Sequence, residues 1–372
     1  RMPAPAELVL GPDRVRLAGP VELGLTAPEG FVNQVLAPEP GAARTLTATA
    51  PIDMTLALRR FSIPRGAEPG AVLPEIDAEL RVPAVNLAAR ETAPIDWQNL
   101  RLVAQTQGEV VRVSATASSP DGGMPIRLSG ELQDAFASGS FSLDTARFTG
   151  TYALTTFPVP VADAIAQANG QLTGLLGPTA DATGVITDMP AVGGTLTVNA
   201  QTPTSTLDYS GRVIARANDG AMLADRAIES TAPVTVRVFE LSDRYGFDVS
   251  SLAPQFQSVA KSREQEPATV MLERLVIPLD FDPESYTVEG DVDPGVFSYR
   301  IGGPLAAVLK PLNAQQQDAV LERFEPFRVT GADGDYRYLG LVLKLGEFRI
   351  ESRGQFNLNR GYEEFVLFVP AG

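Results

Sequence analysis

The sequence predicts a mainly β protein, organised as one long, strongly curved antiparallel sheet that forms an open trough or groove and carries one or two short amphipathic helices. The first observation is that apolar and polar residues alternate through most of the 372 residues, which is typical of antiparallel strands with one dry face. The second is that glycines recur at the centres of these alternating segments. The third is that only two stretches have a helical pattern, and two short helices cannot cover the dry face of about twenty strands.

The expected strands follow one another along the chain with short breaks. Before the main helical stretch they occupy residues 8–25, 45–64, 74–87, 100–104, 111–117, 126–132 and 139–156. After it they occupy 193–216, 232–249, 268–281, 286–292, 296–301 and several segments of 326–369. Laid side by side at ~4.8 Å, about twenty such strands would extend ~95 Å. The sheet must therefore fold over on itself, as a sandwich, a barrel or a long trough.

The helical pattern is clearest between Phe157 and Gly184. Pro160 stands where a first helical residue is expected, and Gly177-Pro178 ends the helix. Gly170 and Gly174 lie inside the pattern and allow a break into two shorter helices. The apolar stripe consists of Val161, Ile165, Leu172, Leu175 and Leu176. We expect this helical segment, about 158–177, to act as a local gate or end-cap on the trough.

Other short segments punctuate the strands. Residues 28–38 allow a helical turn at most, and a second helix is expected from Pro304 to about Leu312. The sequences PDGG at 120–123 and GADGDY at 331–336 have the composition of turns.

Glycine stands at the centre of five alternating segments. A glycine inside a strand weakens it, and it is usually found where a sheet bends or bulges or where two backbones approach closely. The repetition therefore predicts a sheet that curves repeatedly. The five residues are Gly130, Gly150, Gly211, Gly290 and Gly354.

The chain also contains a long internal similarity. The segment LALRRFSIP at 56–64 is similar to VMLERLVIP at 270–278. We divide the chain into a first β-unit at 1–135, a β-unit with the amphipathic helical segment at 136–220, and a second β-unit at 221–372 whose pattern allows it to repeat the first. Repeated units of this kind are typical of end-to-end stacking.

Composition argues against several classes of function. The formal net charge is −15 and the pI is about 4.6, which disfavours binding to nucleic acid. Cysteine and histidine are both absent, which removes thiolate chemistry, serine–histidine catalysis and nearly all zinc sites. We therefore expect a non-catalytic protein without a cofactor or a metal. No apolar run approaches the ~20 residues that cross a bilayer, so we expect any membrane anchor to lie outside this segment.

Acidic residues are the remaining candidates for metal binding or catalysis. Asp280, Asp282 and Glu284 alternate along one segment, and oxygen ligands of this kind can bind calcium. The pairs Asp291 with Asp293 and Asp333 with Asp335 are similar. None has the spacing of the twelve-residue calcium loop, so solvated turns are the preferred interpretation. A glycosidase needs two carboxylates across a cleft, and no motif in the chain selects such a pair.

The segment LTGLLGPTADATG at 172–184, between the glycine strands ARFTGTYAL at 146–154 and LDYSGRV at 207–213, resembles the AsmA-like envelope proteins, a group that includes TamB-type and bridge-like lipid-transfer relatives. The resemblance implies a bent β-trough with an apolar interior, punctuated by short helices. It also implies a location in the periplasm or cell envelope of a double-membrane bacterium. The implied partners are phospholipids or other acyl-chain ligands, with membrane proteins at the two ends of the trough.

The leading hypothesis is therefore a β-groove that binds or conducts phospholipid acyl chains between membranes. Two alternatives remain: an elongated β-sandwich with a structural or adhesion role, and a carboxylate-dependent glycan hydrolase. The candidate lipid contacts are the apolar residues of the helical stripe and of two strands, namely Val161, Ile165, Leu172, Leu176, Leu196, Val198, Leu207, Tyr209 and Val213.

Overall fold

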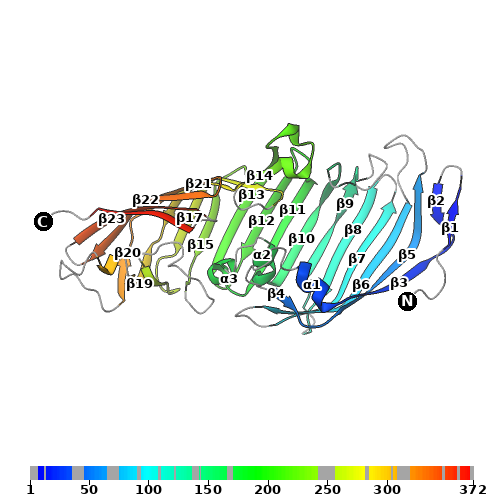
Figure 1. Ribbon diagram of the computed structural model, residues 1–372, viewed down its shortest axis with the longest axis horizontal. Coiled ribbons are helices and arrows are strands. Elements are labelled where there is room, and N and C mark those ends of the chain that lie inside the picture. The colour runs from blue at the N-terminus through cyan, green and yellow to red at the C-terminus, as the bar shows by residue number, and fades with distance from the viewer. Residues whose placement is uncertain are drawn as a thin grey trace.

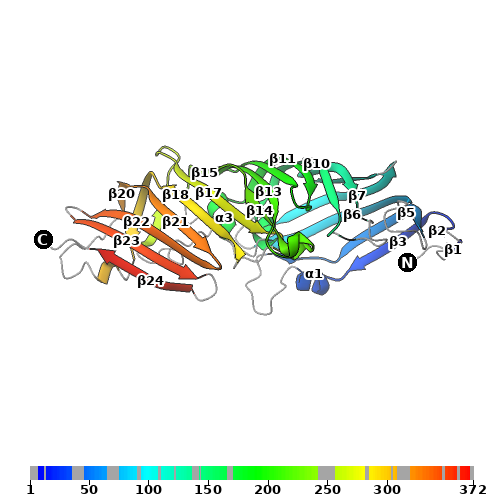
Figure 2. The same cartoon turned by 90° about the horizontal axis from the view of Figure 1, so that it is seen from above.

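A computed structural model confirms the predicted fold class: one large antiparallel sheet, not closed into a barrel, dominates the molecule. Figure 1 shows an elongated protein with its N- and C-terminal ends far apart, and Figure 2 shows the same course from above. The structure describes residues 7–11, 14–35, 46–64, 75–89, 94–107, 110–120, 123–135, 142, 144–165, 171–241, 256–280, 285–302, 305–307, 319–345, 348–357 and 361–368.

Twenty-one strands form the main sheet. From the N-terminus to the helical segment they are β1 (Leu8–Leu10), β2 (Arg14–Leu17), β3 (Val21–Ala27), β4 (Leu46–Ala48), β5 (Ile52–Pro64), β6 (Glu75–Ala89), β7 (Ile95–Gln107), β8 (Val110–Ser118), β9 (Ile126–Gln133) and β10 (Arg147–Pro158). Beyond it they are β11 (Thr179–Met189), β12 (Thr195–Gln201), β13 (Ser205–Ala215), β14 (Arg226–Ser230), β15 (Val234–Val238), β17 (Ala268–Pro278), β18 (Thr287–Asp293), β21 (Phe327–Ala332), β22 (Asp335–Leu345), β23 (Phe348–Asn357) and β24 (Gly361–Phe368).

A second, small sheet and several short helices complete the described fold. The small sheet is formed by β16 (Phe256–Ala260), β19 (Val296–Ile301) and β20 (Val320–Arg323). The helices are α1 (Glu29–Val35), α2 (Val159–Ile165) and α3 (Gln171–Leu176), with the 3₁₀ turns η1 (Asn218–Gly220) and η2 (Leu223–Asp225).

Neighbours in the main sheet are mostly neighbours in the sequence. Strands β5 to β13 pair one after the other, and the pairing runs on through β17, β18 and β21 to β24. Strands β14 and β15 both pair with β13 on one side and with β17 on the other, so they lie end to end in the same row. Hydrogen bonding therefore continues from β1 to β24.

The register separates the sheet into an apolar face and a polar face. Cross-strand partners on the apolar face form the row Leu56, Leu80, Leu102, Ala115, Leu128, Tyr152 and Gly184. One residue away, the polar face carries Ser114, Ser129 and Thr151 in adjacent strands. The apolar face continues toward the C-terminus through the row Leu207, Val236, Val270, Val292 and Phe327. The side-chain period of two, which holds between the bulges of these strands, produces this division.

The strand-centred glycines allow close packing on the apolar face. Gly130 and Gly150 are direct partners, and a Cβ on Gly150 would lie 2.8 Å from Gly130 Cα and 2.8 Å from the Phe148 ring. At Gly184 an added Cβ would overlap the carbonyl oxygen of Thr197 and the ring of Tyr152. The close approach expected at glycine strands is therefore present, with an aromatic ring packed over each of these glycines.

The two similar segments share an irregularity. The pairing of β5 with β6 shifts register between Leu58 and Arg60, and that of β17 with β18 shifts between Leu272 and Arg274. The bulged residues, Arg59 and Glu273, occupy equivalent positions when 56–64 is aligned with 270–278. One hydrogen-bonded sheet crosses both expected boundaries, from β9 to β10 and from β13 to β14. The division of the chain into three units stays a prediction.

Each bulge contributes to an ion cluster on the polar face, and the two clusters have opposite charge. Glu79 is almost fully covered and is contacted by Arg59, Arg81 and Arg101. At the other bulge, the central residue is Arg328, which contacts Glu273, Glu289 and Asp291. Hydrogen bonds from Arg81 and Arg101 to the Glu79 carboxylate lower its pKa from 4.5 to about 2.

Replacing Glu79 by glutamine is expected to lower the free energy of unfolding at neutral pH by about 1–2 kcal/mol, since the half-exposed arginines leave the pair partly screened. Because the pKa of Glu79 is lower in the folded state, the ionised carboxylate contributes fully to the free energy of unfolding above about pH 4.5. This contribution is lost as the pH falls toward about 2. Urea unfolding of the wild type and of the Glu79→Gln variant at several pH values in this range measures the difference in stability. A difference between them that stayed constant with pH would contradict the electrostatic origin.

The helical segment differs from a single continuous helix. It forms α2 and α3, separated by residues outside the described part, in line with the break allowed by the glycines. Residues 28–38, expected to form one turn at most, contain the seven-residue helix α1, which is a correction. Of the helix expected at 304–312, Leu305 to Ala307 are helical and the remainder lies outside the described residues. Figure 1 shows α1, α2 and α3 gathered along one edge of the row of strands.

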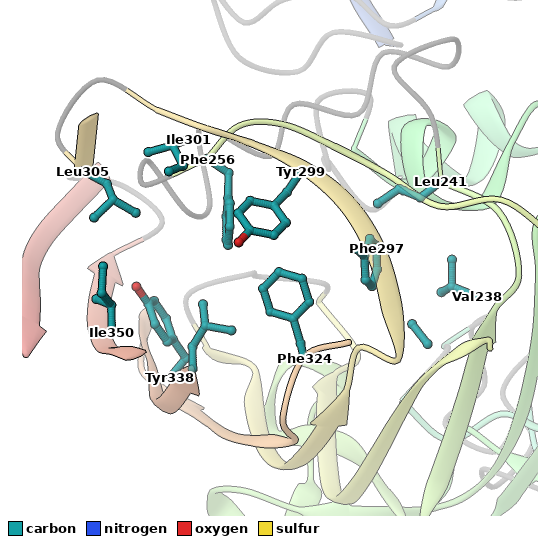
Figure 3. Packing of buried hydrophobic residues seen from close by; sticks show 12 residues of the cluster. Val238, Leu241, Phe256, Phe297, Tyr299, Ile301, Leu305, Phe324, Tyr338 and Ile350 are labelled. Carbon is teal, nitrogen blue, oxygen red and sulfur yellow. The ribbon is translucent and has the colours of Figure 1, made fainter. Parts of the chain in front are cut away.

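The small sheet covers the apolar face of the C-terminal strands. Phe256 on β16, Tyr299 on β19 and Phe324 after β20 pack against Tyr338 and Ile350 of the main sheet (Figure 3). The aromatic rings meet edge to face, with 5.6 Å between the centroids of Phe256 and Tyr299 and 5.2 Å between those of Tyr299 and Phe324. This geometry is favourable for aromatic pairs. In the described part of the chain, this is the region where two sheets form a sandwich.

Candidate apolar binding site

The five predicted strand residues come together in one place. Leu196 and Val198 on β12 pack with Leu207, Tyr209 and Val213 on β13. Ile228, Val234 and other apolar residues of β14, β15 and β17 complete the same group, which we call the central cluster. Period-two alternation is sufficient to place these side chains on one face, and the register between β12 and β13 then brings them into contact.

Their exposure differs in a way that the sequence did not predict. Leu196, Val198 and Leu207 are half-buried, whereas Val213 has no exposed surface. Val213 thus packs the interior of the central cluster instead of lining a surface. Tyr209 is 8% exposed, and its ring lies over Gly211 on the same strand.

The four predicted helix residues do not join the central cluster. Val161 on α2 packs against an N-terminal cluster that includes Leu46, Val85 and Ile95. Leu172 and Leu176 on α3 are half-buried. Ile165 ends α2, and its side chain lies outside the described part. The predicted stripe is therefore divided between two helices that face different neighbours.

The residue of the stripe that reaches a cavity is Leu175, which was not among the predicted contacts. Its carbonyl oxygen accepts a hydrogen bond of 3.1 Å from the hydroxyl of Thr204, which is buried. Asp163 on α2 is fully buried and accepts hydrogen bonds from the backbone N–H groups of Leu172 at 2.8 Å and Thr173 at 3.4 Å. These two N–H groups are at the start of α3, so the carboxylate caps that helix and joins it to α2.

The cavity has a volume of about 380 Å³ and lies between the small sheet and the apolar face. Its walls come from the main sheet, the small sheet and α3, and include Leu175, Val238, Phe256, Val270, Phe297 and Phe327. It was not predicted from the sequence, because residues 296–301 are expected there to be a further strand of one sheet and no strand is expected at 256–260 or 320–323. The available signal was the concentration of aromatic residues between 297 and 327.

A buried hydroxyl of the central cluster has no hydrogen-bond partner. Among the described side chains, the Oη atom of Tyr209 is the orphan, and burial raises the pKa of Tyr209 to about 12. Tyr152 also lies over a glycine, but its hydroxyl donates a 3.0 Å hydrogen bond to the carbonyl oxygen of Thr197. An unpaired buried hydroxyl is costly, whereas a paired one is close to neutral or stabilising.

Replacing Tyr209 by phenylalanine is expected to leave the free energy of unfolding unchanged or to raise it by up to ~1 kcal/mol, because an unpaired polar atom is removed from the interior. The matched change, Tyr152→Phe, removes a paired hydroxyl and should lower it by ~1 kcal/mol. Denaturant unfolding of both variants tests this contrast. Equal losses in the two variants would indicate that a bound water pairs with Tyr209.

The acidic residues considered for metal binding form ion pairs, hydrogen bonds or a turn, or they lie outside the described residues. Asp291 faces Arg328, while Asp293 accepts a 3.0 Å hydrogen bond from the N–H of Gly295 and pairs with Arg323. Asp333 and Gly334, both with positive φ, form the tight turn between β21 and β22. Asp282 and Glu284 lie outside the described residues. Within the described ranges, no group of three acidic side chains is arranged to hold a metal ion.

No helix in the described part is long and apolar enough to cross a membrane. Compared with protein-family models, with curated proteins and with solved structures, the chain matches none.

Proposed function

We propose that the apolar face of the main sheet is a surface for acyl chains, along which the hydrocarbon of phospholipids is bound or conducted between membranes. The observation that carries the proposal is the continuity of this face across the cross-strand register, from β5 through β13 to β22. Side chains on it remain accessible: Leu102 is 38% exposed, and Leu25, on the neighbouring strand β3, is 49% exposed.

The energetics of acyl-chain transfer favour such a surface. Each methylene exposed to water costs ~0.8 kcal/mol, so a whole chain costs on the order of 10 kcal/mol. A continuous apolar face lowers this cost at every position along the path without a catalytic residue. At ~4.8 Å per strand the accessible part of the path, over β5 to β12, is ~35 Å, which exceeds the ~30 Å hydrocarbon core of a bilayer.

The cellular setting of this proposal comes from the resemblance, which is best over residues 140–216. The resemblance implies the envelope of a double-membrane bacterium, with phospholipid as cargo and membrane proteins at the ends of the trough. The role is non-enzymatic. The separation of an apolar face from a polar face supports the binding of acyl chains, since one face would meet hydrocarbon and the other water.

Site-specific photo-crosslinking tests the function. A photoreactive amino acid at Leu128, on the apolar face, is expected to capture phospholipid from cells, and one at the adjacent Ser129, on the polar face, is not. Native mass spectrometry of the purified protein should detect bound phospholipid. Equal capture at the two positions, or purified protein without lipid, would contradict the proposal.

A further inference from the structure

The cavity beneath the small sheet lies on the same face as the open part of the sheet. Val270, Val292 and Phe327 line it, and the register connects them in one row with Val236 and Leu207. Leu207 belongs to the central cluster. The apolar face therefore passes from an accessible part, over β5 to β12, into a part that is roofed by β16, β19 and β20.

The walls of the cavity select against polar ligands. Phe256, Phe297 and Phe324 line it from the side of the small sheet, and valines line it from the main sheet. The nearest buried cation is Lys261, whose ammonium lies 4.6 Å from the centre of the Phe297 ring. That ammonium donates a 2.7 Å hydrogen bond to the carbonyl oxygen of Val296, and Lys261 is not a lining residue. Thr330 and Arg337 also border the cavity, but they are cross-strand partners one residue away from the apolar pair Val329 and Tyr338, and Arg337 is exposed. A head group would therefore find no buried charge to pair with inside, so it would remain outside.

The volume limits what can enter. An apolar cavity of ~150 Å³ stays dry and binds one benzene molecule. At the same packing, the volume of about 380 Å³ corresponds to ~15 carbon atoms. This is the size of one alkyl chain, and it is too small for two.

We infer that this cavity is a pocket for the end of a single alkyl chain, whose head group stays outside. The inference rests on the proposed function and specifies it: the open face carries the chain, and the roofed cavity receives its terminus. Leu175 contributes to the lining from α3, and its helix is held in place by Thr204 and Asp163.

Chain length provides the test. The probes are n-alkyl maltosides, whose neutral head group removes any effect of charge, with chains from ~8 to ~18 carbon atoms to bracket the capacity of the cavity. Binding measured by titration calorimetry should strengthen about fourfold per added methylene while the chain fills the cavity. Beyond ~15 carbon atoms the gain per methylene should fall sharply, to a plateau in this gain, because further methylenes lie on the open face with one side in water. Affinity that continues to rise about fourfold per methylene along the whole series would overturn the inference and leave the proposed function standing. Absence of binding by every probe would contradict both.

Variants of one lining residue move the plateau in opposite directions. Val259→Phe fills part of the cavity and should shorten the chain length at the plateau by ~4 carbon atoms, whereas Val259→Ala should lengthen it by ~2. Val185→Phe, at an exposed position opposite Thr151 on the polar face, is the matched control and should leave the plateau in place. If Val259→Phe fails to fold, Val259→Ala still decides the question. A plateau that is the same in the wild type and in the Val259 variant would overturn the inference.

Discussion

Replacing Ile350 by alanine is expected to lower the free energy of unfolding by about 3 kcal/mol, because truncation of a buried isoleucine loses transfer energy and leaves a cavity. Ile350 on β23 has no exposed surface and belongs to the cluster that joins the main sheet to the small sheet, beside Leu305 and Tyr338 (Figure 3). The change should also loosen the roof over the alkyl-chain pocket. Urea unfolding monitored by circular dichroism gives the stability.

A control for this prediction is available on the small sheet itself. Leu321 on β20 is 61% exposed, so Leu321→Ala should change the free energy of unfolding by less than about 0.5 kcal/mol. Similar losses in the two variants would show that Ile350 does not hold the layers together.

Replacing Gly150 by alanine is expected to cost about 2–3 kcal/mol of stability, the range of overpacked sites. The added Cβ would contact the backbone of Gly130 and Ser129 and the ring of Phe148. Backbone atoms in the middle of a paired sheet cannot move aside without disturbing the ladder between β9 and β10. Thermal unfolding and denaturant unfolding should both report the loss.

The contrasting change is Gly30→Ala in α1, where an added Cβ has no atom within 4 Å. There the substitution should raise the free energy of unfolding by ~0.5–1 kcal/mol, because alanine favours a helix over glycine. Stabilisation by Gly150→Ala would mean that the glycine strands do not depend on close approach.

Both predictions bear on the proposed function. At Gly130, Gly150 and Gly184 ring atoms of Phe148 and Tyr152 occupy the space where a Cβ would stand, so the apolar face stays continuous across these glycines. The cluster around Ile350 holds the roof of the pocket. We expect Gly150→Ala to reduce crosslinking at Leu128, and Ile350→Ala to remove the chain-length plateau.

Much of the fold could be predicted from local patterns. Alternation of apolar and polar residues determines which side chains share a face, because the side-chain period of a strand is two. That rule was sufficient to bring Leu196, Val198, Leu207, Tyr209 and Val213 into one cluster. Turn composition was sufficient for Asp333 and Gly334, where positive φ is required.

The helix contacts were less predictable for a physical reason. A helical stripe is defined by spacing within one continuous helix, whereas α2 and α3 are two short helices with different neighbours. Val161 thus packs with Leu46 and Ile95, whereas Leu175 reaches the cavity. The buried carboxylate of Asp163 fixes that arrangement, and its partners are hydrogen bonds that no periodicity reveals.

The sequence by itself determined the mainly β class of fold, the separation of the two faces and the positions where backbones approach closely, because all of these depend on neighbours along or directly across the strands. It predicted an open trough but also allowed a sandwich or a barrel. Only the tertiary structure decided that β16, β19 and β20 leave the main sheet and roof its C-terminal part. Alternation is the same for a strand in either sheet, and the choice depends on contacts between residues far apart in the chain, such as Phe256 with Phe324 and Leu305 with Ile350. The alkyl-chain pocket results from that choice.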